Sequence, residues 1–112
     1  MYELQFFATD DADWAQRVDL IDDTTNQPLD TAGVLFELEV SDHGARRLFA
    51  TTADGSIAIP ETGTIQWRFT TAQLGALDIR NTYKVGCRMT NGTGTTQLFT
   101  GTLAFVGGGF GR

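Results

Sequence analysis

Several residue types on which proteins build chemical sites are scarce in this chain of 112 residues. It contains one cysteine, Cys87, and one histidine, His43. This excludes an internal disulfide, a cysteine-based structural zinc site and a pair of imidazole ligands. The chain has no long apolar run, and no basic segment followed by an apolar stretch opens it. The sequence therefore predicts neither a membrane span nor a cleaved secretion signal.

The residues that are abundant indicate a β protein. Threonine occurs 17 times and lysine only once. Threonine is favoured on half-exposed strands, whereas lysine is a frequent residue of exposed helix faces. Hydrophobic residues make up 41% of the chain and charged residues 20%, which is typical of a folded protein rather than a disordered one. A chain of this size can bury roughly two-thirds of its unfolded surface, which is enough for one core.

Apolar and polar residues alternate along most of the chain, as in a sheet with one face in the core and the other in water. The clearest strand covers residues 34–41, with Phe36 and Leu38 among its inward side chains. Trp14, Trp67 and Tyr83 also fall on inward faces. The other predicted strands cover residues 3–8, 14–21, 46–52, 56–59, 64–69, 82–90 and 95–106.

Turn residues separate these strands at intervals of about 8–12 residues, as in a sandwich. Residues 22–32 form a turn-rich connection, Asp54-Gly55 predicts a hairpin, and residues 60–63 predict a break in the chain. The one helical candidate is a short turn near residues 71–77, which Thr70 or Thr71 can cap.

These patterns together predict an all-β fold. Seven or eight short strands in about 100 residues favour a single antiparallel β-sandwich of the immunoglobulin-like kind, and a small barrel is the alternative. The sandwich domain is expected to cover residues 1–106. Residues 107–112 are expected to form a flexible, glycine-rich C-terminal tail, because glycine loses the most backbone entropy on ordering.

Two acidic loops are the candidates for a metal site. Asp10, Asp11 and Asp13 lie in one loop, and clustered carboxylates are what calcium prefers, but the loop lacks the glycine and the terminal glutamate of an EF-hand. The second loop, Asp22-Asp23, follows an eight-residue strand and therefore lies roughly 26 Å from the first. The two loops cannot share an ion, and we interpret both as solvated carboxylates, with no metal and no cofactor.

No group of residues predicts catalysis. Ser41, Asp42 and His43 are adjacent in sequence, whereas a hydrolytic triad needs these groups to converge from separate segments. Cys87 alternates in phase with inward residues, which predicts a buried structural thiol. Tryptophan could form a sugar-binding platform only if it were exposed, and Trp14 falls on an inward face. The sequence therefore predicts a protein that is not an enzyme.

Charge is unevenly distributed along the chain, whose formal net charge is −6. Residues 1–42 hold eleven acidic side chains and one basic one, whereas residues 43–112 hold three acidic and seven basic. The acidic balance argues against nucleic-acid binding through phosphates. The asymmetry has two explanations: early strands lie beside late ones, or the surface has an acidic and a basic end suited to head-to-tail contacts.

The tail carries two side chains that a plain linker does not need, Phe110 and Arg112. Aromatic and arginine residues are frequent anchors at protein interfaces. We hypothesise that Phe110 fills an apolar pocket on a neighbouring subunit while Arg112 meets an acidic loop; a tail without a role is the alternative. The candidate interface residues are Phe110, Arg112, Asp10, Asp11, Asp13, Asp22 and Asp23.

Three stretches of the chain together resemble a known group of proteins. Residues 26–34 lead through a proline turn into an alternating strand, and residues 54–77 combine an Asp-Gly turn, two short strands and a helical turn. Tyr83 then opens a strand that is followed by Leu98 and Gly101-Thr102-Leu103. Over about residues 14–106 the chain is similar to immunoglobulin-like domains of tailed-phage and prophage virions, including the N-terminal domain of siphophage upper baseplate proteins.

The resemblance implies a structural and docking role without catalytic residues. It predicts a virion protein of the tail or baseplate, made in the cytoplasm of the bacterial host. Its expected partners are copies of itself, as a homo-oligomer within the particle, and other phage structural proteins, with no nucleic acid and no membrane. A capsid-surface decoration or head-fibre protein is the alternative within this class. A carbohydrate-binding module is the alternative from another class.

Overall fold

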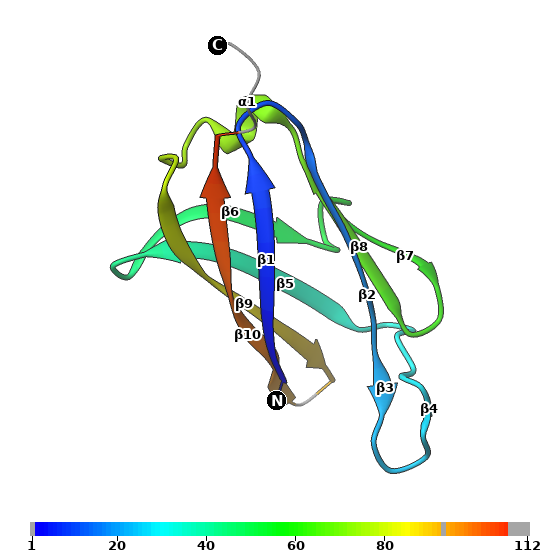
Figure 1. Cartoon of the computed structure of the whole chain (residues 1–112). Helices are drawn as coiled ribbons and strands as arrows, with labels where there is room; N and C mark the ends of the chain where they lie inside the picture. Colours follow the sequence, from blue (N-terminus) through cyan, green and yellow to red (C-terminus); the bar gives the residue numbers. More distant parts are fainter. Residues whose placement is uncertain (1, 93, 108–112) are drawn as a thin grey trace.

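The computed structural model describes residues 2–92 and 94–107, and most of these residues lie in strands (Figure 1). One short helix, α1, spans Thr71–Leu74. The strands are β1 Tyr2–Thr9, β2 Trp14–Asp19, β3 Ile21–Asp22, β4 Gln27–Pro28, β5 Leu35–Asp42, β6 Ala45–Thr51, β7 Ile57–Glu61, β8 Thr64–Phe69, β9 Asn81–Asn91 and β10 Gly94–Val106. Of the predicted tail, only Gly107 lies within the described residues.

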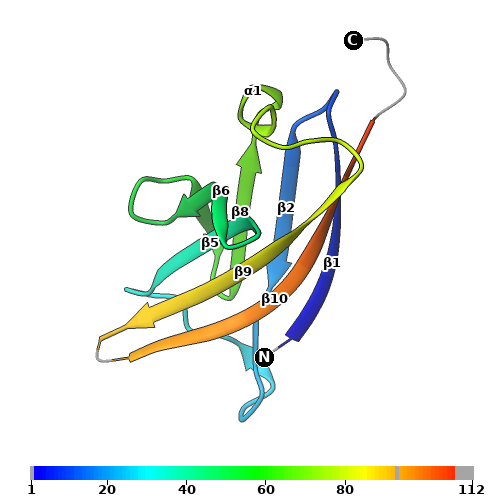
Figure 2. The same ribbon diagram turned by 90° about the vertical axis from the view of Figure 1, so that its left-hand side faces the viewer.

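The strands form two sheets and a small hairpin. A five-stranded sheet has the order β1-β10-β9-β5-β6, a three-stranded sheet has the order β2-β8-β7, and β3 pairs with β4. Apart from β1, these are the orders of strands G-F-C-C′ and B-E-D in an immunoglobulin-like sandwich. The predicted all-β sandwich is therefore confirmed. One pair departs from the antiparallel pattern, because β1 runs parallel to β10 along its whole length (Figure 2).

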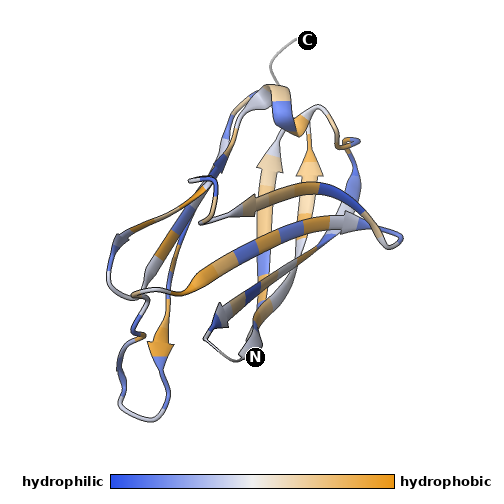
Figure 3. Cartoon of the chain, turned by 180° about the vertical axis from the view of Figure 1, so that it is seen from behind, coloured by the Kyte–Doolittle hydropathy of each residue, from blue (hydrophilic) through white to orange (hydrophobic). Residues whose placement is uncertain are grey.

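The core lies between the two sheets and is rich in aromatic rings. Trp67 of β8 contacts Phe6 of β1 and Phe99 of β10, with ring centroids 5.9 and 6.3 Å apart. Trp14 packs against Phe6 at 5.7 Å. Figure 3 shows hydrophobic and hydrophilic residues alternating along the strands, which is why one face of each sheet can be buried. The inward positions predicted for Phe36, Leu38, Trp14, Trp67 and Tyr83 are all confirmed.

The connection from β8 to β9 is held at one end of the sandwich. Thr70 and Gln73 cap the first turn of α1 reciprocally, which fixes where the helix begins. The helix ends at Leu74, earlier than the predicted residue 77. Tyr83, near the start of β9, accepts a hydrogen bond from the backbone N–H of Asp78 at 2.6 Å. A tyrosine that binds the backbone just upstream is a hallmark of this corner in immunoglobulin-like sandwiches.

Two local predictions need correction. Asp54-Gly55 does not form a hairpin, because it joins β6 of one sheet to β7 of the other. The break predicted over residues 60–63 lies at Thr62-Gly63, the turn between β7 and β8, whereas Pro60 lies inside β7, at an irregularity in the pairing with β8. Proline is tolerated there because β7 is an edge strand and the irregular pairing does not need its missing N–H. Residues 22–32 are turn-rich, as predicted, and include most of the β3–β4 hairpin.

Candidate functional site

The first acidic loop lies beside α1, where Asp13 has a structural role. Its carboxylate accepts hydrogen bonds from Nε of Arg68 and from the backbone N–H of Thr71, both at 3.0 Å. The hydrogen bond from Arg68, reinforced by that from Thr71, holds the pKa of Asp13 below its usual value. Asp13 therefore ties the β1–β2 loop to the end of β8. In the described residues, no group of three or more His, Cys, Asp or Glu side chains could hold a metal ion.

Asp10 and Asp11, the other two acidic residues of that loop, do not share the role of Asp13. The backbone N–H of Asp10 donates to the carbonyl of Val106 at 3.2 Å, which extends the contact between the β1 and β10 ends. One carboxylate oxygen of Asp11 is buried and has no hydrogen-bond partner within residues 2–92 and 94–107. This loop and the Asp22-Asp23 loop lie at opposite ends of the sandwich, as predicted (Figure 1).

An apolar groove of about 590 Å³ opens at the end that carries the β3–β4 hairpin. The five-stranded sheet contributes Leu4 of β1, Met89 of β9 and Leu98 of β10 to one wall. Val18 of β2 and Leu29, just after β4, belong to the other. These five side chains are half-buried and pack against the core from outside. The groove is thus the place where the core of the sandwich reaches the surface.

The path of the chain explains why the sandwich is open there. Strands β1 and β2 are edge strands of different sheets, and they separate with distance from the turn that joins them (Figure 1). In β10 a bulge between Gln97 and Phe99 interrupts the alternation. Phe99 is consequently buried while its neighbour Leu98 is also packed against the core. The Gln97 side chain spans the bulge by donating to the carbonyls of Cys87 and Phe99 at 3.1 and 2.8 Å.

The opposite wall is held by backbone hydrogen bonds around Leu20. Its N–H donates to the carbonyl of Gly63 at 2.6 Å, and its carbonyl accepts from Leu29 N–H at 2.9 Å. Gly63 has a φ of 83°, and a Cβ there would lie 2.7 Å from the Cβ of Pro28. Only glycine meets both conditions without strain, so this residue sets how closely the hairpin approaches the sandwich.

Carboxylates border the groove. Asp19, Asp22 and Asp23 line it, and no basic side chain does so in the described part of the chain. Asp19 accepts a hydrogen bond from the Thr64 hydroxyl at 2.9 Å. Asp22 accepts one from the backbone N–H of Thr24 at the same distance. Both carboxylates stay on the surface and retain lone pairs for further donors.

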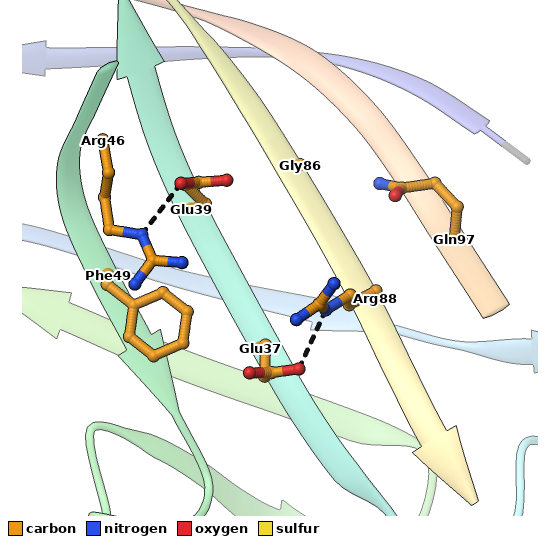
Figure 4. A pocket seen from close by; sticks show the side chains of 7 residues that line it. All are labelled: Glu37, Glu39, Arg46, Phe49, Gly86, Arg88 and Gln97. Atoms are coloured by element: carbon orange, nitrogen blue, oxygen red, sulfur yellow. Dashed lines mark hydrogen bonds and ion pairs between the residues drawn. The ribbon is translucent and has the colours of Figure 1, made fainter. Parts of the chain in front are cut away.

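A second, smaller pocket of about 140 Å³ lies on the water-facing side of the five-stranded sheet (Figure 4). Two ion pairs border it: Arg88 with Glu37 and Arg46 with Glu39, each with an Nε–Oε1 distance of 2.8 Å. The hydrogen bond to Glu37 raises the pKa of Arg88. Arg46 also stacks over the ring of Phe49, 4.1 Å from its centroid. Both arginines are therefore already bound within the chain.

Ion pairs on the surface show how the acidic first part of the chain and the basic second part are arranged. The pairs of Arg46, Arg88, Arg68 and Arg47 each join a base from residues 43–112 to an acid from residues 1–42. Early strands do lie beside late ones, and much of the asymmetry is neutralised within the molecule. Of the groove carboxylates, Asp19 pairs with Arg17 of its own strand, at an Nε–Oδ1 distance of 4.0 Å.

Residues considered for catalysis or sugar binding do not form a site. Burial raises the pKa of the Cys87 thiol to about 12, which suppresses the reactive thiolate. His43 lies in the exposed two-residue turn between β5 and β6, where its Nε2 is 3.2 Å from the Asp42 carboxylate. Trp14 and Trp67 are buried, so neither presents a platform to a sugar.

Of the predicted interface residues, Asp22 and Asp23 border the groove, whereas Asp10, Asp11 and Asp13 lie at the other end. Phe110 and Arg112 lie outside the described residues. Sequence reasoning missed the groove itself. The adjacent apolar pair Leu20-Ile21, which interrupts the alternation between β2 and β3, was the signal that could have marked it.

Comparisons with known proteins identify no family for this chain. No protein-family model and no curated protein matches it. Within the described residues, no helix is long and apolar enough to cross a membrane.

Proposed function

We propose that this protein is a non-enzymatic structural protein of a tailed-phage virion, placed in the tail or baseplate, where it assembles through contacts between subunits. The observation that carries the proposal is the groove, which leaves core side chains such as Leu98 and Met89 half-covered at one end of a rigid sandwich. Apolar hollows rimmed by polar residues are typical of surfaces that bind other proteins. The resemblance of residues 26–34 and 54–77 to virion sandwich domains supports the same proposal.

The proposal is tested by locating the protein in purified phage particles from the host that encodes it. An antibody against the folded domain, followed by immunogold electron microscopy, is expected to label the tail tip at regular copy number. Label distributed over the capsid would instead favour the decoration or head-fibre alternative. The proposal is wrong if mass spectrometry detects the protein in the host lysate but not in particles purified from it.

A further inference from the structure

We propose that the groove between β1–β10 and β2–β3 is the docking site for residues 108–112 of a second copy of this chain. The inference rests on the proposed function, because it names the contact by which subunits assemble. The segment reads Gly-Gly-Phe-Gly-Arg. It offers one large apolar side chain and one cation, separated by a single glycine.

The groove and the segment match in chemistry. The walls of the groove are apolar side chains, including Leu4, Val18 and Leu98, and they suit the ring of Phe110. The carboxylates along the groove carry negative charge with no basic residue among the described lining, and they suit the guanidinium of Arg112. Side chains two residues apart in an extended segment point to the same side, roughly 7 Å apart. One extended segment can therefore place Phe110 in the groove and Arg112 against the carboxylates.

The segment cannot enter the groove of its own chain. Strand β10 runs from the groove to the opposite end of the sandwich (Figures 1 and 2). The eight residues from Leu98 to Val106 cover roughly 26 Å at about 3.3 Å each. Leu4, which also lines the groove, pairs with Gly101, roughly 20 Å from Gly107 at about 3.3 Å per residue, whereas the backbone of Phe110, three residues past Gly107, reaches at most about 11 Å. The occupant must therefore come from another molecule.

The contact is consequently directional. Each copy offers its segment at one end and its groove at the other, which is a head-to-tail arrangement. Such contacts generate a ring if the rotation closes and a filament if it does not. Ordering several glycines is entropically costly, so one contact is weak, and the assembly gains strength when many copies are held together.

The experiment detects the contact between full-length molecules in solution. A nitroxide attached at Gly108→Cys is mixed with isotope-labelled, spin-label-free protein, and paramagnetic broadening is measured by NMR at high concentration. Cys87 is buried and its thiol pKa is raised, so only the introduced thiol is labelled. We expect broadening of the Leu4, Val18, Met89 and Leu98 methyl signals in the other molecule. A nitroxide at Ala53→Cys, in the exposed loop before β7, is the positional control and should leave these signals unchanged.

Matched variants separate the two halves of the contact. Phe110→Ala in the chain that carries the nitroxide should weaken the association at least about tenfold, as expected for an aromatic anchor. Asp22→Asn should weaken it by a smaller factor, about threefold, because the amide oxygen can still accept from Thr24 but the charge is lost. Asp78→Asn removes the same charge from the α1 end and should have no effect.

Three results would overturn the inference: no broadening at millimolar concentration, broadening confined to residues outside the groove, or equal association of Phe110→Ala and the unaltered chain. The second would show that the segment binds another surface, and the third that Phe110 does not make the contact. Failure of the inference is distinguishable from failure of the proposed function. A protein that is present in particles but shows no broadening remains a virion protein that assembles by another surface.

Discussion

At the end of the sandwich that carries α1, polar side chains bind the backbone of neighbouring segments, whereas at the end that carries the β3–β4 hairpin, apolar side chains line an open groove. At the first end, Asp13 and Tyr83 each accept a hydrogen bond from the backbone N–H of another segment. At the second, the hydrogen bonds lie within each wall and leave the apolar surface between the walls uncovered. One end of this fold is therefore closed by its own hydrogen bonds, which we call the closed end, and the other leaves apolar surface half-covered.

The same division applies to charge. The carboxylate of Asp13 is engaged with Arg68, and those of Glu37 and Glu39 are engaged with arginines on the sheet. Asp22 at the groove instead receives its hydrogen bond from the uncharged backbone of its own hairpin. A substitution at the closed end should therefore alter folding, and one at the groove should alter association.

The largest effect is expected from the centre of the core. Phe36 is completely buried, so Phe36→Ala should lower the free energy of unfolding by about 3–5 kcal/mol, out of a total of about 5–15 for a domain of this kind. Leu98→Ala in the half-covered groove should cost about 1 kcal/mol. Urea unfolding of the two variants measures the difference. Equal losses would show that the groove is packed as tightly as the core.

A smaller effect is expected at the closed end from Tyr83→Phe. The substitution keeps the buried ring and removes only the hydroxyl that accepts from the Asp78 N–H. The loss should be about 1–3 kcal/mol, because the backbone group is left without its partner. Thermal unfolding and hydrogen exchange at residues 78–83 measure it. If exchange there is unchanged, the hydroxyl does not hold this corner.

The smallest effect is expected from Asp13→Asn, and it should depend on pH. The folded-state pKa of Asp13 is lowered, so its charge stabilises the fold above its unfolded pKa of about 3.9, and this stabilisation is lost as pH falls through the folded value. The melting temperature of the variant should lie below that of the unaltered protein at pH 7. The difference should shrink as pH falls below about 3.9 and passes through the lowered folded-state pKa of Asp13. A difference that is constant with pH would mean that the Arg68 contact contributes through geometry rather than charge.

The sequence alone predicts most of this fold, because strand alternation is a local signal. In β5 every second side chain is apolar and the core-facing set follows directly. The errors occur where long-range pairing overrides local signals. Asp54-Gly55 has hairpin chemistry, yet β6 and β7 belong to different sheets, and no local pattern specifies which strands pair. Pro60 predicts a break because proline lacks the N–H that a central strand needs. It lies inside β7 because β7 is an edge strand, which the sequence does not reveal.

The groove was less predictable than the fold. Two of its three acidic residues, Asp22 and Asp23, could be selected from their position at the end of a strand. Its walls depend on the bulge before Phe99 and on the separation of β1 from β2, which are properties of the folded sheets. Leu98 therefore reads in the sequence as one residue of a long strand, although it lies at the surface of the groove.

The parallel pairing of β1 with β10 also has a consequence for how the chain is made. Strand β1 precedes all other strands, yet its sheet partner begins only after residue 93, so Tyr2 must wait for Phe99 to be synthesised. Until then Phe6 has no partner strand beside it, and the five-stranded sheet cannot close before β10 has been synthesised. Contacts this distant in sequence slow folding, and an unpaired early strand is a target for chaperones and for aggregation. Gly101 of β10 must stay glycine for this pairing, because a Cβ there would overlap the carbonyl oxygen of Leu4. A substitution at this late position would therefore prevent β1, the first strand to be made, from docking.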